Sequence, residues 1–246
     1  DVLAAVHTTF RAAGADELPA YHIFLPGSWR NDHAVVEALG WRRTAAAKVG
    51  LVDELERLRY EWTPQAGIPA DRGRLTFRPE PDDEAMLEVF VRVAEASLDD
   101  GTRKGIAAHG LHRQARQELA IYLGMPGNRD WWRVAYTAEG ELVGLALPSA
   151  NTSGPVVGYL GVVPEHRGQG YVDDLLGEVT RILAAEGADR VVADTDVGNA
   201  PMAAAFEKKY GIKVELWRSQ SERVVQRVVS EARAGRHTVD VVATNG

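Results

Sequence analysis

Two glycines in residues 156–176 stand where a protein chain can bind phosphate. Residues 156–163 are apolar and predict a buried strand, Pro164 ends it, and a helix is predicted from Gly170 onward. Glycines between a buried strand and a helix let several backbone N–H groups converge on one point, where the helix dipole also favours negative charge. Gly168 and Gly170 therefore predict a phosphate-binding loop. The alternative is that they only provide turn geometry.

The sequence around these glycines is similar to a known motif. The run Val162-Val-Pro-Glu-His-Arg-Gly-Gln-Gly-Tyr171 resembles motif A of the GNAT family, the acyl-CoA-dependent N-acetyltransferases, with the consensus Gln/Arg-x-x-Gly-x-Gly/Ala. Both glycines match, whereas Glu165 departs from the first consensus position. The resemblance implies that the pyrophosphate of coenzyme A lies over residues 167–171, with Arg167 supplying positive charge. It also implies that the backbone of residues 161–163 binds the pantetheine arm, and that an N–H near Val163 polarises the acyl carbonyl.

A second segment, residues 194–202, resembles motif B of the same family, whose asparagine contacts pantetheine. Asn199 takes that place, although it is equally suited to cap a helix with Pro201 in the first turn. The residues that the resemblance assigns to acetyl-CoA are Gly161, Val162, Val163, Arg167, Gly168, Gln169, Gly170, Tyr171, Asn199 and Phe206.

The expected proton donor to the departing thiolate is missing from its usual place. The family has a tyrosine seven residues after the asparagine, and this position holds Phe206, which is also suited to plain core packing. Either Tyr210, one helical turn further on, or water protonates the sulfur, or this copy is catalytically weak.

Two carboxylates are candidates for the base that deprotonates an amine. Asp194 and Asp196 end a predicted strand at a spacing of two, which places them on one face. The alternative is that they steer a cation or cap the turn before Asn199. Tyr159, on the strand before the glycines, is a further candidate.

Composition describes an ordinary globular protein with an excess of acid. Of 246 residues, 45% are hydrophobic and 26% charged, and the net charge is −7. This balance argues against nucleic-acid binding and favours a small cationic amine as substrate. The chain has no cysteine, which excludes disulfides and thiolate chemistry. His109 and His112 share a helical face but lack a third ligand, so no metal is expected.

The chain holds no apolar run of about 18 residues, and no signal peptide opens it, so the sequence predicts a cytoplasmic protein that does not bind membranes. It begins at Asp1 rather than Met, which indicates a fragment or a processed product. The oligomeric state is open.

The order of predicted elements indicates one working domain preceded by part of another. The segment around Gly14 resembles that around Gly187, at an offset of 173 residues, and that around Gly40 resembles that around Gly211, at an offset of 171. These offsets indicate an internal repeat, as in tandem members of the family. We expect the following parts: a degenerate GNAT-like half-domain (1–62), a linker (63–73), a GNAT acetyltransferase domain (74–212) and an atypical tail (213–246).

Hydrophobic periodicity and turn residues place the individual elements. In the first part they predict helices at 1–13 and 32–39, a strand at 21–25 and strands after Trp41. In the GNAT domain they predict strands at 75–78, 131–137 and 141–147 and helices at 82–96, 106–123 and 171–186. The fold class is therefore α/β with a mixed sheet, of the acyl-CoA N-acyltransferase type that the resemblance implies.

The tail resembles a different family. Residues 206–242 are similar to the first lobe of periplasmic solute-binding proteins of ABC transporters, with a helix at 222–233 and a strand at 238–242. This likeness leaves the last strands of the GNAT sheet open.

The sequence as a whole predicts an N-acetyltransferase that moves acetyl from acetyl-CoA to a small amine by direct attack in a ternary complex. Its rivals are a non-catalytic acyl-CoA-binding module and a solute-binding or interaction fragment.

Overall fold

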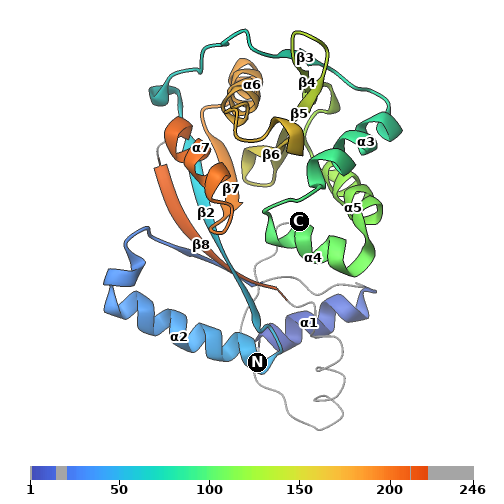
Figure 1. The fold of residues 1–246 in the computed structure, drawn as a ribbon. Helices are drawn as coiled ribbons and strands as arrows, with labels where there is room; N and C mark the ends of the chain where they lie inside the picture. The colour runs from blue at the N-terminus through green and yellow to red at the C-terminus, as the bar shows by residue number, and fades with distance from the viewer. Residues whose placement is uncertain (1, 15–20, 211, 221–246) are drawn as a thin grey trace. The chain divides into compact units, whose positions relative to one another are not determined.

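A computed structural model describes residues 2–14, 21–210 and 212–220 (Figure 1). The chain divides into two compact units, which we call unit 1 (residues 1–58 and 214–246) and unit 2 (residues 59–213). The boundaries fall within two strands, β2 (Asp53–Trp62) and β8 (Ile212–Gln220). The predicted helix at 222–233 and strand at 238–242 lie outside the described residues.

Unit 1 combines helices with a short run of strands. Its elements are α1 (Val2–Ala12), β1 (Tyr21–Leu25), η1 (Trp29–Asn31), α2 (His33–Lys48) and parts of β2 and β8. Strand β1 pairs antiparallel with β8, from Tyr21 opposite Ser219 to Leu25 opposite Glu215. Its core includes Leu3, Leu25, Trp29, Leu39, Ala46, Val49 and Leu51.

Helix α2 corrects one prediction of the sequence analysis. Asp32 begins it by accepting the N–H groups of Ala34 and Val35, as an N-cap should. The helix then continues to Lys48, so of the strands predicted after Trp41 the structure has β2, which starts well after that residue. Residues 42–48 are mostly arginine, alanine and lysine, which are strong helix formers, and the strand β2 begins only at Asp53.

Unit 2 is built on a mixed sheet with the strand order β2-β7-β6-β5-β4-β3. Its further strands are β3 (Thr76–Arg78), β4 (Arg133–Tyr136), β5 (Leu142–Asn151), β6 (Gly154–Val162) and β7 (Val191–Asp196). Neighbours from β3 to β6 are antiparallel, whereas β6 and β7 are parallel. The predicted α/β fold with a mixed sheet is confirmed.

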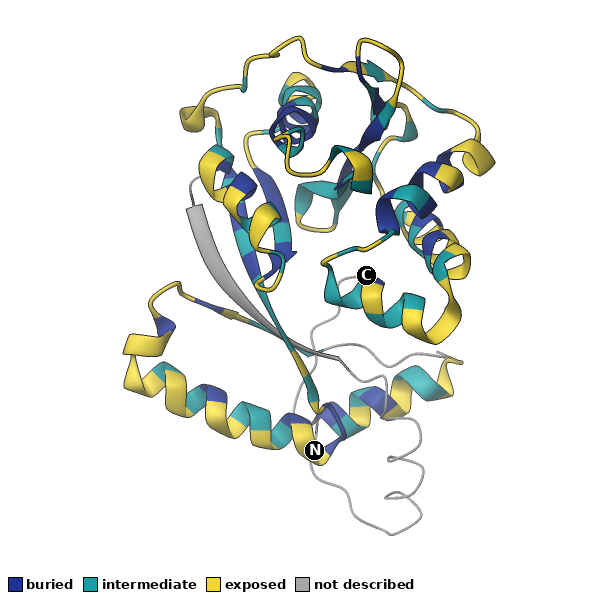
Figure 2. Cartoon of the chain, viewed as in Figure 1, coloured by how far each residue is buried: buried dark blue, intermediate teal, exposed yellow. Residues whose placement is uncertain are grey.

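Helices and short 3-10 turns complete unit 2. They are η2 (Pro64–Ala66), α3 (Asp83–Ala94), α4 (Asp100–His109), α5 (Leu111–Gly124), η3 (Arg129–Trp131), η4 (Pro164–His166), α6 (Val172–Ala185) and α7 (Ala200–Tyr210). The helix predicted at 106–123 is in fact two helices, because Gly110 ends α4 with a φ of 85°. The dark blue faces of α3 and α5 in Figure 2 belong to a core shared with β4 and β5, including Phe90, Leu119, Val134 and Leu145.

The parallel strands β6 and β7 pair over only part of their length. Among the described residues their pairing is recorded at Val156 opposite Val192, near the start of both strands, and not beyond it. The carboxyl-terminal halves, which carry Tyr159–Val162 and Asp194–Asp196, are therefore not joined by a ladder. We call this opening the notch.

None of the helices in the described part of the chain is long and apolar enough to cross a membrane.

Candidate active site

The loop between β6 and α6 presents a row of backbone N–H groups. Gly168 and Gly170 have φ angles of 77° and 74°, a conformation that favours glycine. Within the described part of the chain, the amides of residues 168–172 make no hydrogen bond to any acceptor, and the first bonded amide is Asp173 N–H, which donates to the carbonyl of Gly170. This row at a helix N-terminus is the arrangement that suits a phosphate group.

The space next to the two glycines is open. A Cβ added at Gly168 would meet no atom within 4 Å, and one added at Gly170 would meet only Nη2 of Arg74, at 3.9 Å. The bend is thus not plugged by side chains, and a polyanion can approach the backbone closely.

Arg74 is a residue that the sequence analysis missed. Its guanidinium donates to the carbonyls of Gln169 and Gly170, at 3.2 and 3.0 Å, and lies 4.9 Å from the centre of the Tyr171 ring. It also pairs with Asp174. A cation thereby stands at the glycine loop although it lies almost one hundred positions earlier in the chain, and no local pattern in the sequence points to it.

The two carboxylates in the first turn of α6 are buried and neutralised. Asp173 pairs with Lys208 and with Arg72, whose Nη2 lies 3.3 Å from Oδ2, and Asp174 pairs with Arg74. Burial alone would raise the pKa of Asp173, but the hydrogen bond and charge of Lys208 outweigh it and lower that pKa. The carboxylates therefore repel a neighbouring phosphate less than their position suggests.

The side chain of Arg167 does not serve the glycine loop as predicted. Its guanidinium donates to the carbonyls of Val93, Glu95, Ala96 and Val162, at 2.7 to 3.0 Å. These are the last carbonyls of α3, its continuation and the end of β6, so Arg167 closes the C-terminus of a helix. Its N–H donors are engaged there, and the arginine that contacts the glycine loop is Arg74 instead.

The hydrogen bonds between β5 and β6 show which amides of β6 point toward the notch. The N–H of Val163 donates to the carbonyl of Val143 at 2.9 Å, so it is engaged within the sheet, and the predicted donor near Val163 has to be a neighbouring amide. In an antiparallel pair such bonds alternate, so Gly161 also faces β5, while Val162 and Leu160 turn their backbone groups toward β7. The Val162 carbonyl accepts from Arg167, which leaves its N–H directed into the notch.

Gly161 has a separate role in packing. A Cβ at this position would lie 2.1 Å from Cγ1 of Val93 on α3, closer than any real contact. Glycine therefore lets α3 approach β6 at the point where the notch begins.

The two predicted base candidates are held by other groups. Asp194 forms a bidentate pair with Arg59, with both N–O distances at 2.8 Å. Asp196 is buried, and its Oδ2 accepts the N–H of Asp100 at 2.7 Å, which ties the end of β7 to the first turn of α4. Both thus have structural tasks at the edge of the notch.

Tyr210 and Phe206 belong to an aromatic cluster in the core. Phe206 lies 5.6 Å from Tyr60 and 6.1 Å from Tyr210 between ring centres, and all three are buried. The Tyr210 hydroxyl bonds to Oγ1 of Thr180 at 3.0 Å, and burial raises the pKa of Tyr210. The Tyr210 hydroxyl is therefore buried against α6.

Asn199 lies immediately before α7, and its carbonyl accepts the N–H of Ala203. It therefore begins the helix, as one of the two predictions for it requires, and its amide side chain stays a candidate contact for pantetheine. Among the described residues no group of three or more His, Asp or Glu is placed to hold a metal ion.

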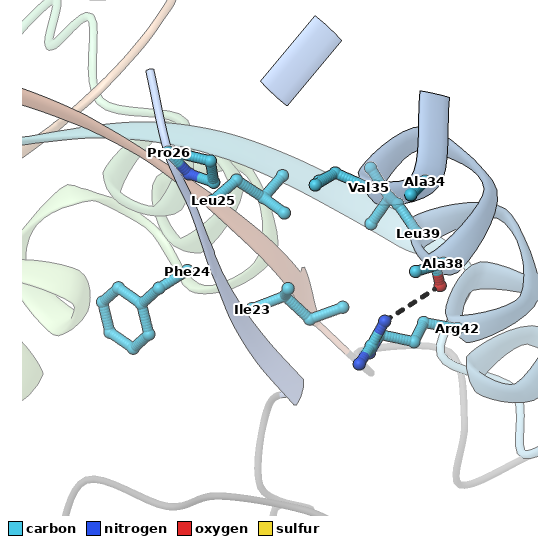
Figure 3. A pocket seen from close by; sticks show the side chains of 9 residues that line it. All are labelled: Ile23, Phe24, Leu25, Pro26, Ala34, Val35, Ala38, Leu39 and Arg42. Atoms are coloured by element: carbon cyan, nitrogen blue, oxygen red, sulfur yellow. Dashed lines mark hydrogen bonds between the residues drawn. The ribbon is translucent and has the colours of Figure 1, made fainter. Parts of the chain in front are cut away.

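Unit 1 contains a hollow of its own, of about 390 Å³, between β1 and α2 (Figure 3). Its walls are apolar, with Leu25, Val35 and Leu39 among them, and Arg42 donates to the carbonyl of Ala38 at its edge. It has none of the N–H row or open strand pair seen in unit 2.

Comparisons with known proteins relate this mixed sheet and its loop to one family and fold. A model of the acetyltransferase (GNAT) family matches residues 102–212. The GCN5-related N-acetyltransferase from Sphaerobacter thermophilus is similar in structure, with a TM-score of 0.53 and 15% identity over 96% of this chain and 67% of that one. A functionally unknown conserved protein from Staphylococcus epidermidis ATCC 12228 gives 0.52 and 13% over 82% and 73%. No curated protein matches the sequence.

The family model matches somewhat less than half of the chain, and the mixed α/β fold matches that of its GNAT acyltransferase neighbours. An incomplete N-terminal copy and the likeness of the tail to solute-binding proteins are not shown by these comparisons, and both stay predictions.

Proposed function

We propose that the protein is an N-acetyltransferase that moves acetyl from acetyl-CoA to a small amine by direct attack in a ternary complex. The observation that carries the proposal is the row of amides at residues 168–172, beside two glycines with open space and the cation of Arg74. The net charge of −7 favours a cationic acceptor. A cytoplasmic location, as expected from the sequence, is part of this proposal.

Each group of unit 2 has a task in this reaction. The amides of Gly168, Gln169, Gly170 and Tyr171 would hold the pyrophosphate, helped by the positive end of α6. The Val162 N–H, directed into the notch, would polarise the acyl carbonyl, and Asn199 would contact the pantetheine arm. Acetyl-CoA supplies the activated acyl group, and the chain positions it against the amine.

The binding test is isothermal titration of the whole chain with acetyl-CoA, repeated on Gly168→Glu. A side chain at a φ of 77° is strained by about 1–2 kcal/mol and places a carboxylate in front of the amides. We expect the affinity for acetyl-CoA to fall by about tenfold or more.

The matched control is Gly187→Glu. Gly187 follows the other end of α6, has a φ of 87° and also has open space, so it carries the same strain without facing the loop. Equal affinities for Gly168→Glu and Gly187→Glu would contradict a pyrophosphate site at the loop.

The second candidate is a non-catalytic acyl-CoA-binding module. It is favoured by Phe206 in place of a tyrosine, and by the burial of the Tyr210 hydroxyl against Thr180. Both candidates bind acetyl-CoA, but only an enzyme releases free coenzyme A when amines are added. Because the chain has no cysteine, a thiol reagent reports that release without background from the protein.

A further inference from the structure

A cluster of polar groups connects the two strands that border the notch, and the residue at its centre is not among the predicted site residues. Its centre is Glu118 on α5, whose Oε1 accepts from Oγ1 of Thr102 at 2.7 Å and from Nε2 of Gln114 at 2.9 Å. Its other oxygen, Oε2, is buried and, apart from the Tyr159 phenol described below, has no hydrogen-bond donor among the described residues. A buried carboxylate oxygen with so few donors is costly, and therefore calls for a functional explanation.

One side of this cluster is β6. Tyr159 stands on the part of β6 that β7 does not pair with, and its phenol interacts with the Glu118 carboxylate. The Tyr159 ring stacks on Phe90 at 5.0 Å and lies 5.6 Å from Tyr122, so the carboxylate meets an aromatic wall.

The other side of the cluster is β7. Thr102, which bonds to Glu118, lies in the first turn of α4 and donates its backbone N–H to Asp99. The N–H of Asp100, in the same turn, donates to Asp196 at the end of β7. Contacts therefore lead from β6 through Glu118 and the first turn of α4 to the end of β7, the two strands that border the notch.

Charged and titratable groups face Glu118 from the elements packed against it. Asp99 faces it from α4 and Tyr159 from β6, while Asp100 is paired with Arg103 and Lys104 and so is neutralised. Burial, with Asp99, raises the pKa of Glu118 above the ordinary value in spite of the hydrogen bonds from Gln114 and Thr102.

We propose that Glu118 is the general base of the transfer and that the acceptor is a primary amine that arrives as its ammonium ion. The inference rests on the proposed function. Glu118 Oε2 takes one proton from the ammonium, whose nitrogen then forms the bond to the acyl carbon as the carbon–sulfur bond breaks. The second proton lost by the nitrogen goes to the departing sulfur, giving the amide and free thiol, and Glu118 returns its proton to solvent.

The experiment compares the whole chain with Glu118→Gln, Glu118→Asp and the control Glu88→Gln, an exposed carboxylate on α3. Acetyl-CoA binding is measured by isothermal titration, and thiol release with phenethylamine, spermidine and glucosamine from about pH 5.5 to about pH 9. We expect all four proteins to bind acetyl-CoA equally. Glu118→Gln should lower kcat/KM by about 100-fold and remove the fall of activity toward acid, while Glu118→Asp retains part of both.

A second measurement shows that a loss of activity is not a loss of fold. A carboxyl whose pKa is raised in the folded state costs stability where it is ionised, so Glu118→Gln should unfold at the same or a higher temperature than the wild type at pH 8. If Glu118 had only a structural role, Glu118→Gln would instead lower the unfolding temperature.

The outcomes separate the two proposals. Wild-type activity and an unchanged pH profile in Glu118→Gln would overturn the base while leaving the transferase intact. Binding of acetyl-CoA without thiol release from any of the three amines would overturn the base and favour the non-catalytic module. Failure of the wild type to bind acetyl-CoA would instead overturn the proposed function itself.

Discussion

At the scale of single residues, the structure distinguishes side chains at the glycine loop from side chains that stabilise the ends of helices and strands. Arg167 was predicted as a site residue from a motif, but a motif gives a residue's place and not the direction of its side chain. The four carbonyls it meets come from α3 and β6, and three of them lie more than seventy positions away in the chain. Arg74 was missed for the same reason, because only the fold brings it to the glycine loop.

The bracing role of Arg167 predicts the result of Arg167→Met. The variant leaves the carbonyls of Val93, Glu95 and Ala96 without their donor, although water replaces part of it at this exposed site. We expect a loss of about 1–2 kcal/mol in the free energy of unfolding, measured by urea denaturation. A weaker affinity for acetyl-CoA with unchanged stability would instead show that the guanidinium grips phosphate.

At the scale of elements, local sequence patterns predicted those helices, strands and loops whose positions depend on interactions between neighbouring residues. The strand Tyr21–Leu25 was predicted with its observed bounds, and the glycine loop was placed correctly between β6 and α6. The break at Gly110 was not found, because helix periodicity continues across a single glycine. The helix α2 was predicted too short, because Gly40 follows the predicted end and is typical of a helix stop, yet the helix continues through it. The separation of β6 from β7 depends on packing between distant segments, which no local pattern in the sequence encodes.

The close approach of α3 to β6 predicts a coupled pair of substitutions. Gly161→Ala places a Cβ where Cγ1 of Val93 lies, so either the helix shifts or the side chain moves, at a cost of about 1–3 kcal/mol. Val93→Ala removes that carbon and costs stability by itself, since Val93 is buried. In the double variant the clash is absent, so its loss in urea denaturation should be smaller than the sum of the two single losses. Strict additivity would contradict the packing role of Gly161.

At the scale of the whole molecule, the order of predicted elements together with the family resemblance predicted the fold class. The observed boundary lies between Leu58 and Arg59, within β2, where no linker composition marks it. The proposed domain plan, with a half-domain at 1–62, a linker at 63–73 and a GNAT domain at 74–212, stays a prediction. So does the origin of the tail from 213 onward.

The dependence of stability on pH is a property of the whole molecule to which two buried carboxyls contribute with opposite sign. The pKa of Asp173 is lowered in the folded state, so its contribution is present above the ordinary pKa of about 4 and is lost as the pH falls below that value. The pKa of Glu118 is raised, so its contribution is present in acid and is lost as the pH rises through the folded pKa.

Lys208→Gln and Glu118→Gln should therefore change the thermal unfolding profile in opposite directions. Lys208→Gln removes the first partner of Asp173 and should lower Tm on the order of 1–2 °C at pH 7, a small change because the lysine is largely exposed, and should have almost no effect at pH 2.5. Glu118→Gln should leave Tm unchanged in acid and raise or maintain it at pH 8. Calorimetry at the three pH values distinguishes the two, and a Lys208→Gln effect that is equal at pH 7 and pH 2.5 would contradict the pairing with Asp173, since a protonated carboxyl gains nothing from the ammonium.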